Sequence, residues 1–349
     1  MKQLVIAERF CLIGHVVSMA FGLAGLLLVL PHPEFIVTLP PFGQNVFQWS
    51  MAGGGVVYIL LGAVAVAIYA YRMLGLRTWL TFMLPSVILS LSSELLGTST
   101  GFPFGHYGYL NGLGYKIAGL VPFTIPLSWF YLGFASYLLA RVGLDSGQTS
   151  KSNSTQWLYQ VGAIALGALL LTSWDFVLDP AMSQTAVPFW EWQQPGAFFG
   201  MPYQNFAGWM GTGALFMGVA ALFWQKTPIQ LPQIATEKNS APDLGLPLAI
   251  YLSNFAFAAI MSLAAGMWIP VLLGVIVGVV PALALWRMAQ VRYQRHSFAE
   301  SQAVALAVAL ESAEFGSESN QLSVGELVAD PATNLQPERT VSPIGVMPK

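Results

Sequence analysis

Charged residues are scarce in this sequence. Only 9% of its 349 residues are Asp, Glu, Lys or Arg, whereas 55% are hydrophobic and the mean hydropathy is +0.62. A soluble domain carries about 25% charged residues, so the composition argues against a soluble protein and indicates an integral membrane protein. The net charge of −2 also argues against nucleic acid as a partner.

Residues that bind metals or carry out redox chemistry are equally rare. The one cysteine, Cys11, can form no internal disulfide. There are four histidines, which argues against a membrane di-iron oxygenase because that class needs many. The sequence has no G-x-G-x-x-G motif opening a strand–helix unit and no P-loop, so it predicts no flavin, nicotinamide or nucleotide site. We therefore predict neither a metal nor a cofactor.

Long apolar runs are what the chain has instead. A membrane-spanning helix needs about 20 apolar residues, and eight segments are about this long. They are 10–30, 51–71, 78–97, 121–140, 157–175, 205–224, 246–265 and 268–286. The last two share one apolar block, so seven spans is the alternative count. The sequence predicts an all-α, polytopic membrane helix bundle within a transmembrane domain over residues 1–290.

The basic residues indicate how this bundle is oriented. With a cytoplasmic N-terminus and eight spans, thirteen of the fourteen Lys and Arg residues fall on the cytoplasmic side, and only Lys116 lies in an outer loop. Cytoplasmic loops of membrane proteins are enriched in Lys and Arg, so we expect both termini to be cytoplasmic. Residues 291–349 are rich in Ser, Glu, Pro and Asn, a composition that predicts a largely disordered tail.

Acidic residues stand at the outer ends of two predicted spans. Glu94 lies near the end of the third span, and Asp175 and Asp179 stand at the end of the fifth, in TSWDFVLDP (172–180). Ionisable residues inside a membrane segment are costly and are functional candidates. If the fifth helix continues through Pro180, the two aspartates share one face; if it stops at Asp175, they are separate loop residues. We predict that these three carboxyl groups are catalytic.

The outer loops are also much richer in aromatic residues than the inner loops. An interfacial belt would place aromatic residues at both faces of the membrane, so an excess at one face favours a binding site. The alternatives are that the aromatic residues form only such a belt and that Glu191 is a solvated loop residue. The predicted substrate-binding residues are His106, Tyr107, Trp174, Trp190, Glu191, Phe199, Tyr203, Asn205 and Trp209. Tight turns or close helix packing explain the predicted structural residues, which are Gly97, Gly101, Gly105, Pro180, Gly196 and Gly200.

Two blocks of sequence resemble the CruF-type carotenoid 1,2-hydratase family. They are SSELLGTSTGFPFGHYGY (92–109) and DFVLDP followed by PFWEWQQPGAFFGMPYQNFAGW (175–180 and 188–209). The similarity covers most of the membrane region and excludes the tail. The resemblance implies carotenoid biosynthesis, with addition of water to the terminal 1,2 double bond of an acyclic end group. The implied enzyme is a lyase (hydro-lyase) that converts lycopene or γ-carotene to a 1-hydroxy product, as in the synthesis of myxoxanthophyll.

The resemblance leaves the exact substrate open, because the family includes hydratases of longer, archaeal-type carotenoids. The partners that it implies are a carotenoid substrate, membrane lipid and a carotenoid glycosyltransferase acting on the hydroxylated product. The implied location is the plasma or thylakoid membrane.

Hydration of a trisubstituted alkene needs a proton donor, a group that accepts a proton from water, and stabilisation of a tertiary carbocation. A carboxyl group in an apolar site stays protonated, and a second carboxylate nearby separates the titrations of the pair. Aromatic faces stabilise a desolvated cation by about 2 kcal/mol each. We expect Asp175 or Glu94 to donate the proton and Asp179 to hold or activate the water. His106 and Tyr107 would help to position that water.

Three other functions fit parts of the same pattern. The Asp175–Asp179 spacing is a DxxxD, as in UbiA-type membrane prenyltransferases that bind magnesium and diphosphate, but the sequence lacks their NxxxDxxxD block. Intramembrane acids also serve as relay groups in proton-coupled membrane carriers. A lycopene-cyclase-like enzyme would begin with the same protonation and end in ring closure.

Overall fold

The computed structural model describes residues 1–145, 153–185, 187–224 and 243–295, with four further residues of the tail. Helices dominate, and they are α1 (Lys2–Ala24), α2 (Pro33–Thr38), α3 (Pro41–Thr100), α4 (Thr124–Leu144), α5 (Asn153–Gln184), α6 (Tyr203–Trp224), α7 (Gly245–Ala264) and α8 (Trp268–Gly274), with the π-helical turns η1 (Gly25–Val29) and η2 (Val275–Val279). The strands are β1 (Tyr107–Tyr109), β2 (Lys116–Ile117), β3 (Val121–Pro122) and β4 (Trp190–Trp192). The helical unit extends over Met1–Arg295. Most of the predicted inner loop (144–156) and tail (291–349) lies outside the described residues.

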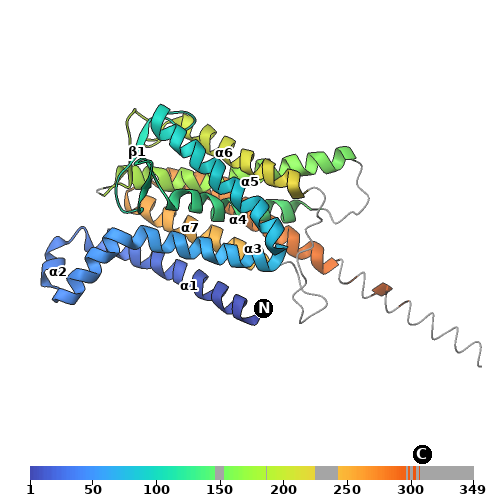
Figure 1. Cartoon of the computed structure of the whole chain (residues 1–349), viewed down its shortest axis with the longest axis horizontal. Helices are drawn as coiled ribbons and strands as arrows, with labels where there is room; N and C mark the ends of the chain where they lie inside the picture. The colour runs from blue at the N-terminus through green and yellow to red at the C-terminus, as the bar shows by residue number, and fades with distance from the viewer. Residues whose placement is uncertain are drawn as a thin grey trace, which may run out of the picture. The chain divides into compact units, whose positions relative to one another are not determined.

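Seven helices in the described part of the chain are long and apolar enough to cross a membrane. One of them, Gly53–Thr100, has 48 residues, which as a single helix would measure about 72 Å, against about 30 Å for the hydrocarbon core. Gly75 interrupts it with a non-helical φ of 78° and ψ of 165°, and α3 folds back on itself (Figure 1). Divided at Gly75, this helix gives two segments of crossing length, so the described chain has eight such segments in all, and the predicted all-α membrane bundle is confirmed.

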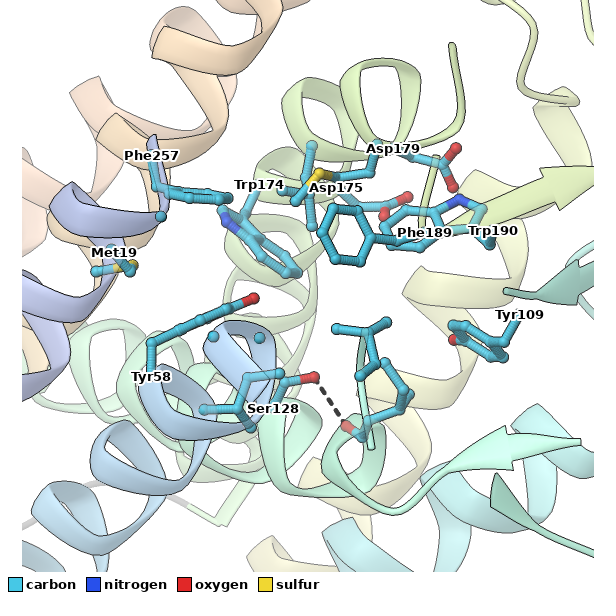
Figure 2. Close-up of a pocket in the computed structure, with 18 of the residues that line it drawn as sticks. Met19, Tyr58, Tyr109, Ser128, Trp174, Asp175, Asp179, Phe189, Trp190 and Phe257 are labelled. Carbon is cyan, nitrogen blue, oxygen red and sulfur yellow. Dashed lines mark hydrogen bonds between the residues drawn. The ribbon is translucent and has the colours of Figure 1, made fainter. Parts of the chain in front are cut away.

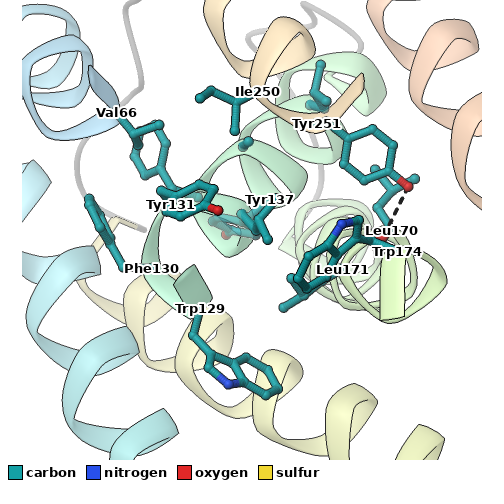
Figure 3. Close-up of a cluster of buried hydrophobic side chains, with 14 of the residues drawn as sticks. Val66, Trp129, Phe130, Tyr131, Tyr137, Leu170, Leu171, Trp174, Ile250 and Tyr251 are labelled. Carbon is teal, nitrogen blue, oxygen red and sulfur yellow. Dashed lines mark hydrogen bonds between the residues drawn. The ribbon is translucent and has the colours of Figure 1, made fainter. Parts of the chain in front are cut away.

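Helix α4 forms the centre of the bundle. Its side chains are buried all round, apart from Leu127 and the last turn, as expected of a helix that is apolar on every face. Residues of α4, α5 and α7 meet in one core (Figure 3), where Tyr251 donates a hydrogen bond to the Leu170 carbonyl at 3.1 Å. By contrast, α1 exposes large apolar side chains such as Phe10 and Phe21, and α1 is therefore a peripheral, lipid-facing helix.

An ion cluster lies at the end of the bundle opposite to β1. The N-terminus marks this end in Figure 1. Arg72, close to the Gly75 turn, forms two hydrogen bonds with the buried Glu8 of α1, at 2.9 and 3.1 Å, and lies 3.6 Å from Asp243. The cluster links α1, α3 and the start of α7 at the end where the sequence placed most of the basic residues.

A second buried polar chain links four helices in the middle of the bundle. His15 of α1 lies with Nδ1 2.7 Å from the Tyr58 carbonyl, and since a carbonyl only accepts, Nδ1 carries the proton. Nε2 then accepts from Asn254 Nδ2 at 3.0 Å, and Asn254 Oδ1 accepts from the Tyr131 hydroxyl at 3.0 Å. Every donor in this chain has an acceptor, which is the condition for burying polar groups without a large penalty.

Replacing Asn254 with leucine is expected to destabilise the bundle. The change leaves both the Tyr131 hydroxyl and His15 Nε2 without partners, and each unpaired buried group costs about 1–3 kcal/mol. Thermal unfolding in detergent, followed by circular dichroism, should show a lower midpoint. The control is Ser253→Ala, because the Ser253 hydroxyl bonds only to the Ile250 carbonyl of its own helix among the described residues. Equal midpoints for the two variants would show that the buried chain contributes little.

Candidate functional site

Helix α5 carries two of the three predicted catalytic carboxyl groups near its C-terminal end. The helix continues through Pro180 to Gln184, although proline lacks the N–H that would bond to the carbonyl four residues earlier. Ala181, directly after it, is completely buried, so tertiary packing holds the last turn. Asp175 and Asp179 therefore lie one turn apart on the same face, and the predicted end of this span at residue 175 was too early.

An amide from a neighbouring helix joins the two aspartates. Asn205, in the first turn of α6, donates from Nδ2 to Asp175 Oδ2 at 2.7 Å and to Asp179 Oδ2 at 3.3 Å. Asp179 Oδ1 also accepts from Trp192 Nε1 at 2.9 Å and from Ser183 Oγ at 3.3 Å. Within the described residues, no second hydrogen-bond donor reaches Asp175. The two aspartates and Asn205 are all buried, and the Asp175 residue is only 1% exposed.

Glu94, from the second half of α3, accepts hydrogen bonds from three side chains. Its Oε1 accepts from Trp129 Nε1 of α4 at 2.9 Å, and its Oε2 accepts from the Tyr109 hydroxyl at 2.9 Å and from the Tyr107 hydroxyl. Burial and the adjacent Glu94 carboxyl raise the pKa of Tyr107 and Tyr109 well above the ordinary tyrosine value. Both hydroxyl groups therefore stay protonated and act as hydrogen-bond donors to Glu94. Burial of Glu94 favours the protonated form of its carboxyl group, whereas three converging donors favour the ionised form.

A small antiparallel sheet of β1 and β4 covers the site and donates hydrogen bonds to two of the three carboxyl groups, those of Glu94 and Asp179. Tyr107 pairs with Trp192, and Tyr109 pairs with Trp190. Side chains alternate between the two faces of a strand, so these four rings face the site, whereas Glu191, opposite Gly108, faces away. Glu191 is accordingly exposed. The alternation explains why a carboxylate flanked by two site residues lies outside the site.

Glycines allow the covering loops to approach one another closely. A Cβ on Gly97 would lie 2.7 Å from Phe104 Cδ2, and one on Gly196 would collide with the backbone of Gly200 and Met201. The remaining predicted loop glycines, Gly101, Gly105 and Gly200, have positive φ. Of the predicted structural residues, these glycines thus have a steric or conformational reason to be glycine.

The carboxyl groups meet at one partly open space with a volume of about 110 Å³. Glu94 from α3 and both aspartates from α5 line it, and Figure 2 shows Asp175 and Asp179 on the side where Trp190 and Tyr109 also lie. Its aromatic lining includes Tyr58, Tyr107, Tyr109, Trp129, Trp174, Trp190, Trp192 and Trp209. The site is therefore an apolar cavity lined by aromatic side chains, and its acidic groups lie near the covering sheet.

The predicted binding residues divide into two groups. Tyr107, Trp174, Trp190, Asn205 and Trp209 line the cavity. His106, Glu191, Phe199 and Tyr203 belong to the same loops but do not line it. His106 is exposed with its ring against Gly101, and Tyr203 is 62% exposed in a ring cluster with Phe198 and Phe206.

Several lining residues were not predicted from the sequence. Trp129 and Tyr58 lie within apolar helices, where one more aromatic residue gives no signal beyond ordinary membrane composition. Trp129 stacks on Trp209 with ring centroids 4.0 Å apart while donating to Glu94. Tyr109 and Trp192 lie in loops that were predicted to hold the site, but their inward direction depends on the pairing of β1 with β4.

A metal-binding group is not evident in the same region. Within residues 1–145, 153–185, 187–224 and 243–295, no three His, Cys, Asp or Glu side chains come together as a set of metal ligands. The carboxyl groups instead bond to Tyr, Trp, Ser and Asn side chains.

Comparison with known proteins places these observations in a family. A bisanhydrobacterioruberin hydratase of Haloarcula japonica is 34% identical over 128 residues, a match that covers 37% of this chain and 40% of that protein. No solved structure matches the chain. The model of the family described as carotenoid biosynthesis protein matches residues 54–281, which is more than half of the chain and includes Glu94, Asp175 and Asp179. The chain belongs to the carotenoid biosynthesis protein family.

Proposed function

We propose that this protein is a carotenoid 1,2-hydratase, which adds water to the terminal double bond of an acyclic carotenoid end group. The observation that carries the proposal is the cavity itself, where three buried carboxyl groups from two helices line one apolar, aromatic space. Hydration of a hydrocarbon needs acid–base groups in a site that also accepts an apolar substrate. Membership of a carotenoid biosynthesis family and the partial similarity to a protein named as a carotenoid hydratase support the same chemistry.

Asp175 is the proposed proton donor. Two carboxyl groups that share one amide donor, with no cationic side chain among the described residues that line the cavity, cannot both be ionised at low cost. Asp179 has three hydrogen-bond donors and Asp175 has one, so the proton of the pair resides on Asp175. Glu94, with three donors of its own, is the stable carboxylate of the site. The sequence left open whether Asp175 or Glu94 donates the proton, and the proposal assigns this role to Asp175.

In the proposed reaction, Asp175 protonates C2 of the end group and a tertiary carbocation forms at C1. Three tryptophans line the cavity: Trp209 stacks on Trp129 and meets Trp174 in an edge-to-face contact. Their aromatic faces stabilise the cation, and so does the negative charge of the Glu94 carboxylate. Water attacks C1 while Asp179 accepts its proton, which then returns to Asp175. The aspartate pair thus ends the cycle in its original protonation state, and the substrate gains the elements of one water.

The attacking water has a candidate donor in Trp190. Its indole nitrogen is buried on the Asp179 side of the cavity (Figure 2), where it interacts with the Asp179 carboxyl but makes no hydrogen bond of normal geometry within the described residues. A water between Trp190 and Asp179 would complete the hydrogen bonding of this buried N–H group. Trp190 therefore takes the water-positioning role that the sequence suggested for His106.

The proposed orientation keeps both termini in the cytoplasm. Arg72, Arg141 and Arg292 lie at the end of the bundle opposite to the covering sheet, where Arg292 donates to the Gly143 carbonyl at 3.1 Å. Basic residues favour the cytoplasmic side of a membrane, so the covering sheet would face outward.

Expression in hosts that accumulate lycopene, γ-carotene or bisanhydrobacterioruberin tests the function. We expect a product that is heavier by the mass of one water and more polar on reversed-phase chromatography. A product of unchanged mass and altered absorption would instead indicate a cyclase. If all three carotenoids remain unchanged while the protein is present in the membrane, the proposed activity is wrong.

A further inference from the structure

Helices α1 and α3 separate from one another toward the candidate site. In the middle of the bundle they are in close contact, since a Cβ on Gly14 would lie 3.1 Å from Leu61 and a Cβ on Gly62 would lie 2.8 Å from His15. Farther along α1, a Cβ on Gly22 would meet nothing within 4 Å. The nearest atom to a Cβ on Gly54 of α3 is Ser50 Oγ at 3.7 Å, in the same helix. The two helices thus form a wedge-shaped gap.

This gap is continuous with the cavity that holds the carboxyl groups. Gly22 and Gly25 of α1 and η1, and Gly54 and Gly55 of α3, line the same space as Glu94 and the two aspartates. At Gly22, Gly25 and Gly54, neither close packing nor a positive φ requires glycine. Glycine in a helix interior lowers helix stability by about 1 kcal/mol relative to alanine. The presence of glycine at these positions therefore needs another explanation.

The surface around the gap is apolar. Val17, Phe21 and Leu28 on the α1 side are 60%, 56% and 67% exposed, and Val57 on α3 is 48% exposed. Side chains of this kind face lipid in a membrane-spanning bundle. The gap therefore opens toward the bilayer, in contrast to the sheet of β1 and β4, which covers the cavity at the end of the bundle.

We propose that the gap between α1 and the first half of α3 is the lateral entrance of the site, occupied by the linear polyene chain of the substrate. The inference rests on the proposed function. The whole space, gap included, has a volume of about 110 Å³, smaller than the 300–1,000 Å³ or so of pockets that bury a drug-sized ligand, so it holds only one end of a carotenoid and the remaining chain must extend out of it. The gap provides an apolar route directly from the reacting end into lipid, where such a chain dissolves.

Adjacent glycines of α3 allow a matched test. Gly54→Leu places a side chain in the entrance, whereas Gly53→Leu adds the same side chain at a position that has nothing within 4 Å and does not line the cavity. Both changes favour helix formation. Binding of an acyclic carotenoid to the purified protein would be followed by quenching of tryptophan fluorescence, and conversion by chromatography of pigments from the expressing host.

We expect Gly54→Leu to lower apparent affinity and conversion by about tenfold or more, because the added side chain would occupy the space that the polyene needs; tenfold corresponds to about 1.4 kcal/mol. Gly53→Leu should stay within about twofold of the unmodified protein, as surface changes usually do. Gly22→Leu fills the entrance from the opposite wall and replaces Gly54→Leu if that variant does not elute as a folded protein.

The outcomes separate the entrance from the activity. Equal binding of the carotenoid by Gly53→Leu, Gly54→Leu and Gly22→Leu would overturn the proposal that the gap is the substrate entrance, whether or not the protein hydrates the carotenoid. Conversely, if no variant and no unmodified protein converts the carotenoid, the proposed function fails, and the binding comparison still tests the entrance.

Discussion

Asp175→Asn is expected to lower the rate of carotenoid hydration by about 10²- to 10⁴-fold, which is the range that a positioned general acid contributes. Asparagine has nearly the same shape as aspartic acid, so the packing of α5 is kept. It cannot transfer a proton to carbon, and in the proposed mechanism no other group donates a proton to the substrate. The measurement is the initial rate of hydrated product formed by membranes that contain equal amounts of each protein.

Glu191→Gln is the matched control for this change. It removes the carboxylate of a residue that was predicted to bind substrate, but Glu191 lies on the face of the β1–β4 sheet that points away from the site, so the rate of this variant should remain within about twofold. Asp179→Asn tests the division of roles within the pair. Full activity of Asp175→Asn, together with a large loss in Asp179→Asn, would reverse the assignment of acid and water-activating group.

Glu94→Gln is expected to cause the second large loss, of about 10²-fold or more, comparable to removal of a preorganised electrostatic group from an enzyme site. The change keeps the size of the side chain and removes the negative charge that faces the developing cation. It also places an amide N–H₂ where Tyr107, Tyr109 and Trp129 present donors. Hydration rate and carotenoid binding should be measured together, since the proposed role predicts a larger loss in rate than in binding.

Trp129→Phe provides the graded comparison for Glu94. It removes one of the three donors but keeps an aromatic ring against Trp209. Loss of one hydrogen bond to a charged group costs about 1.5–3 kcal/mol, so an effect of about tenfold to a hundredfold is expected. If Glu94→Gln is folded and hydrates carotenoid at the normal rate, Glu94 is a structural residue and the site must be reduced to the aspartate pair.

The positions of the carboxyl groups in the chain already pointed to a site. A charge is expensive in a membrane segment, so Glu94 and Asp175 were conspicuous among apolar neighbours without any knowledge of the fold. The same reasoning identified the crossing segments, including the two that α3 joins through Gly75. These inferences succeeded because the bilayer acts on each segment separately, through its length and polarity.

The direction in which side chains point could not be obtained in this way. His106 and Glu191 stand beside Tyr107 and Trp192 in the chain, yet one residue of each neighbouring pair lines the cavity and the other does not. Strands of three residues are too short for their alternation to be recognised before β1 and β4 are known to pair. For the same reason, the sequence could not exclude either residue from the site.

The sequence by itself determined that this chain crosses a membrane as a helix bundle and that acidic residues gather near one end of it. Only the tertiary structure decided that α5 passes through Pro180, that Asn205 joins the two aspartates, and that Trp129 reaches Glu94 from an apolar helix. The physical reason is that transfer into lipid depends on the composition of each segment alone. A hydrogen bond between distant residues depends on how the helices pack, and no single segment contains that information.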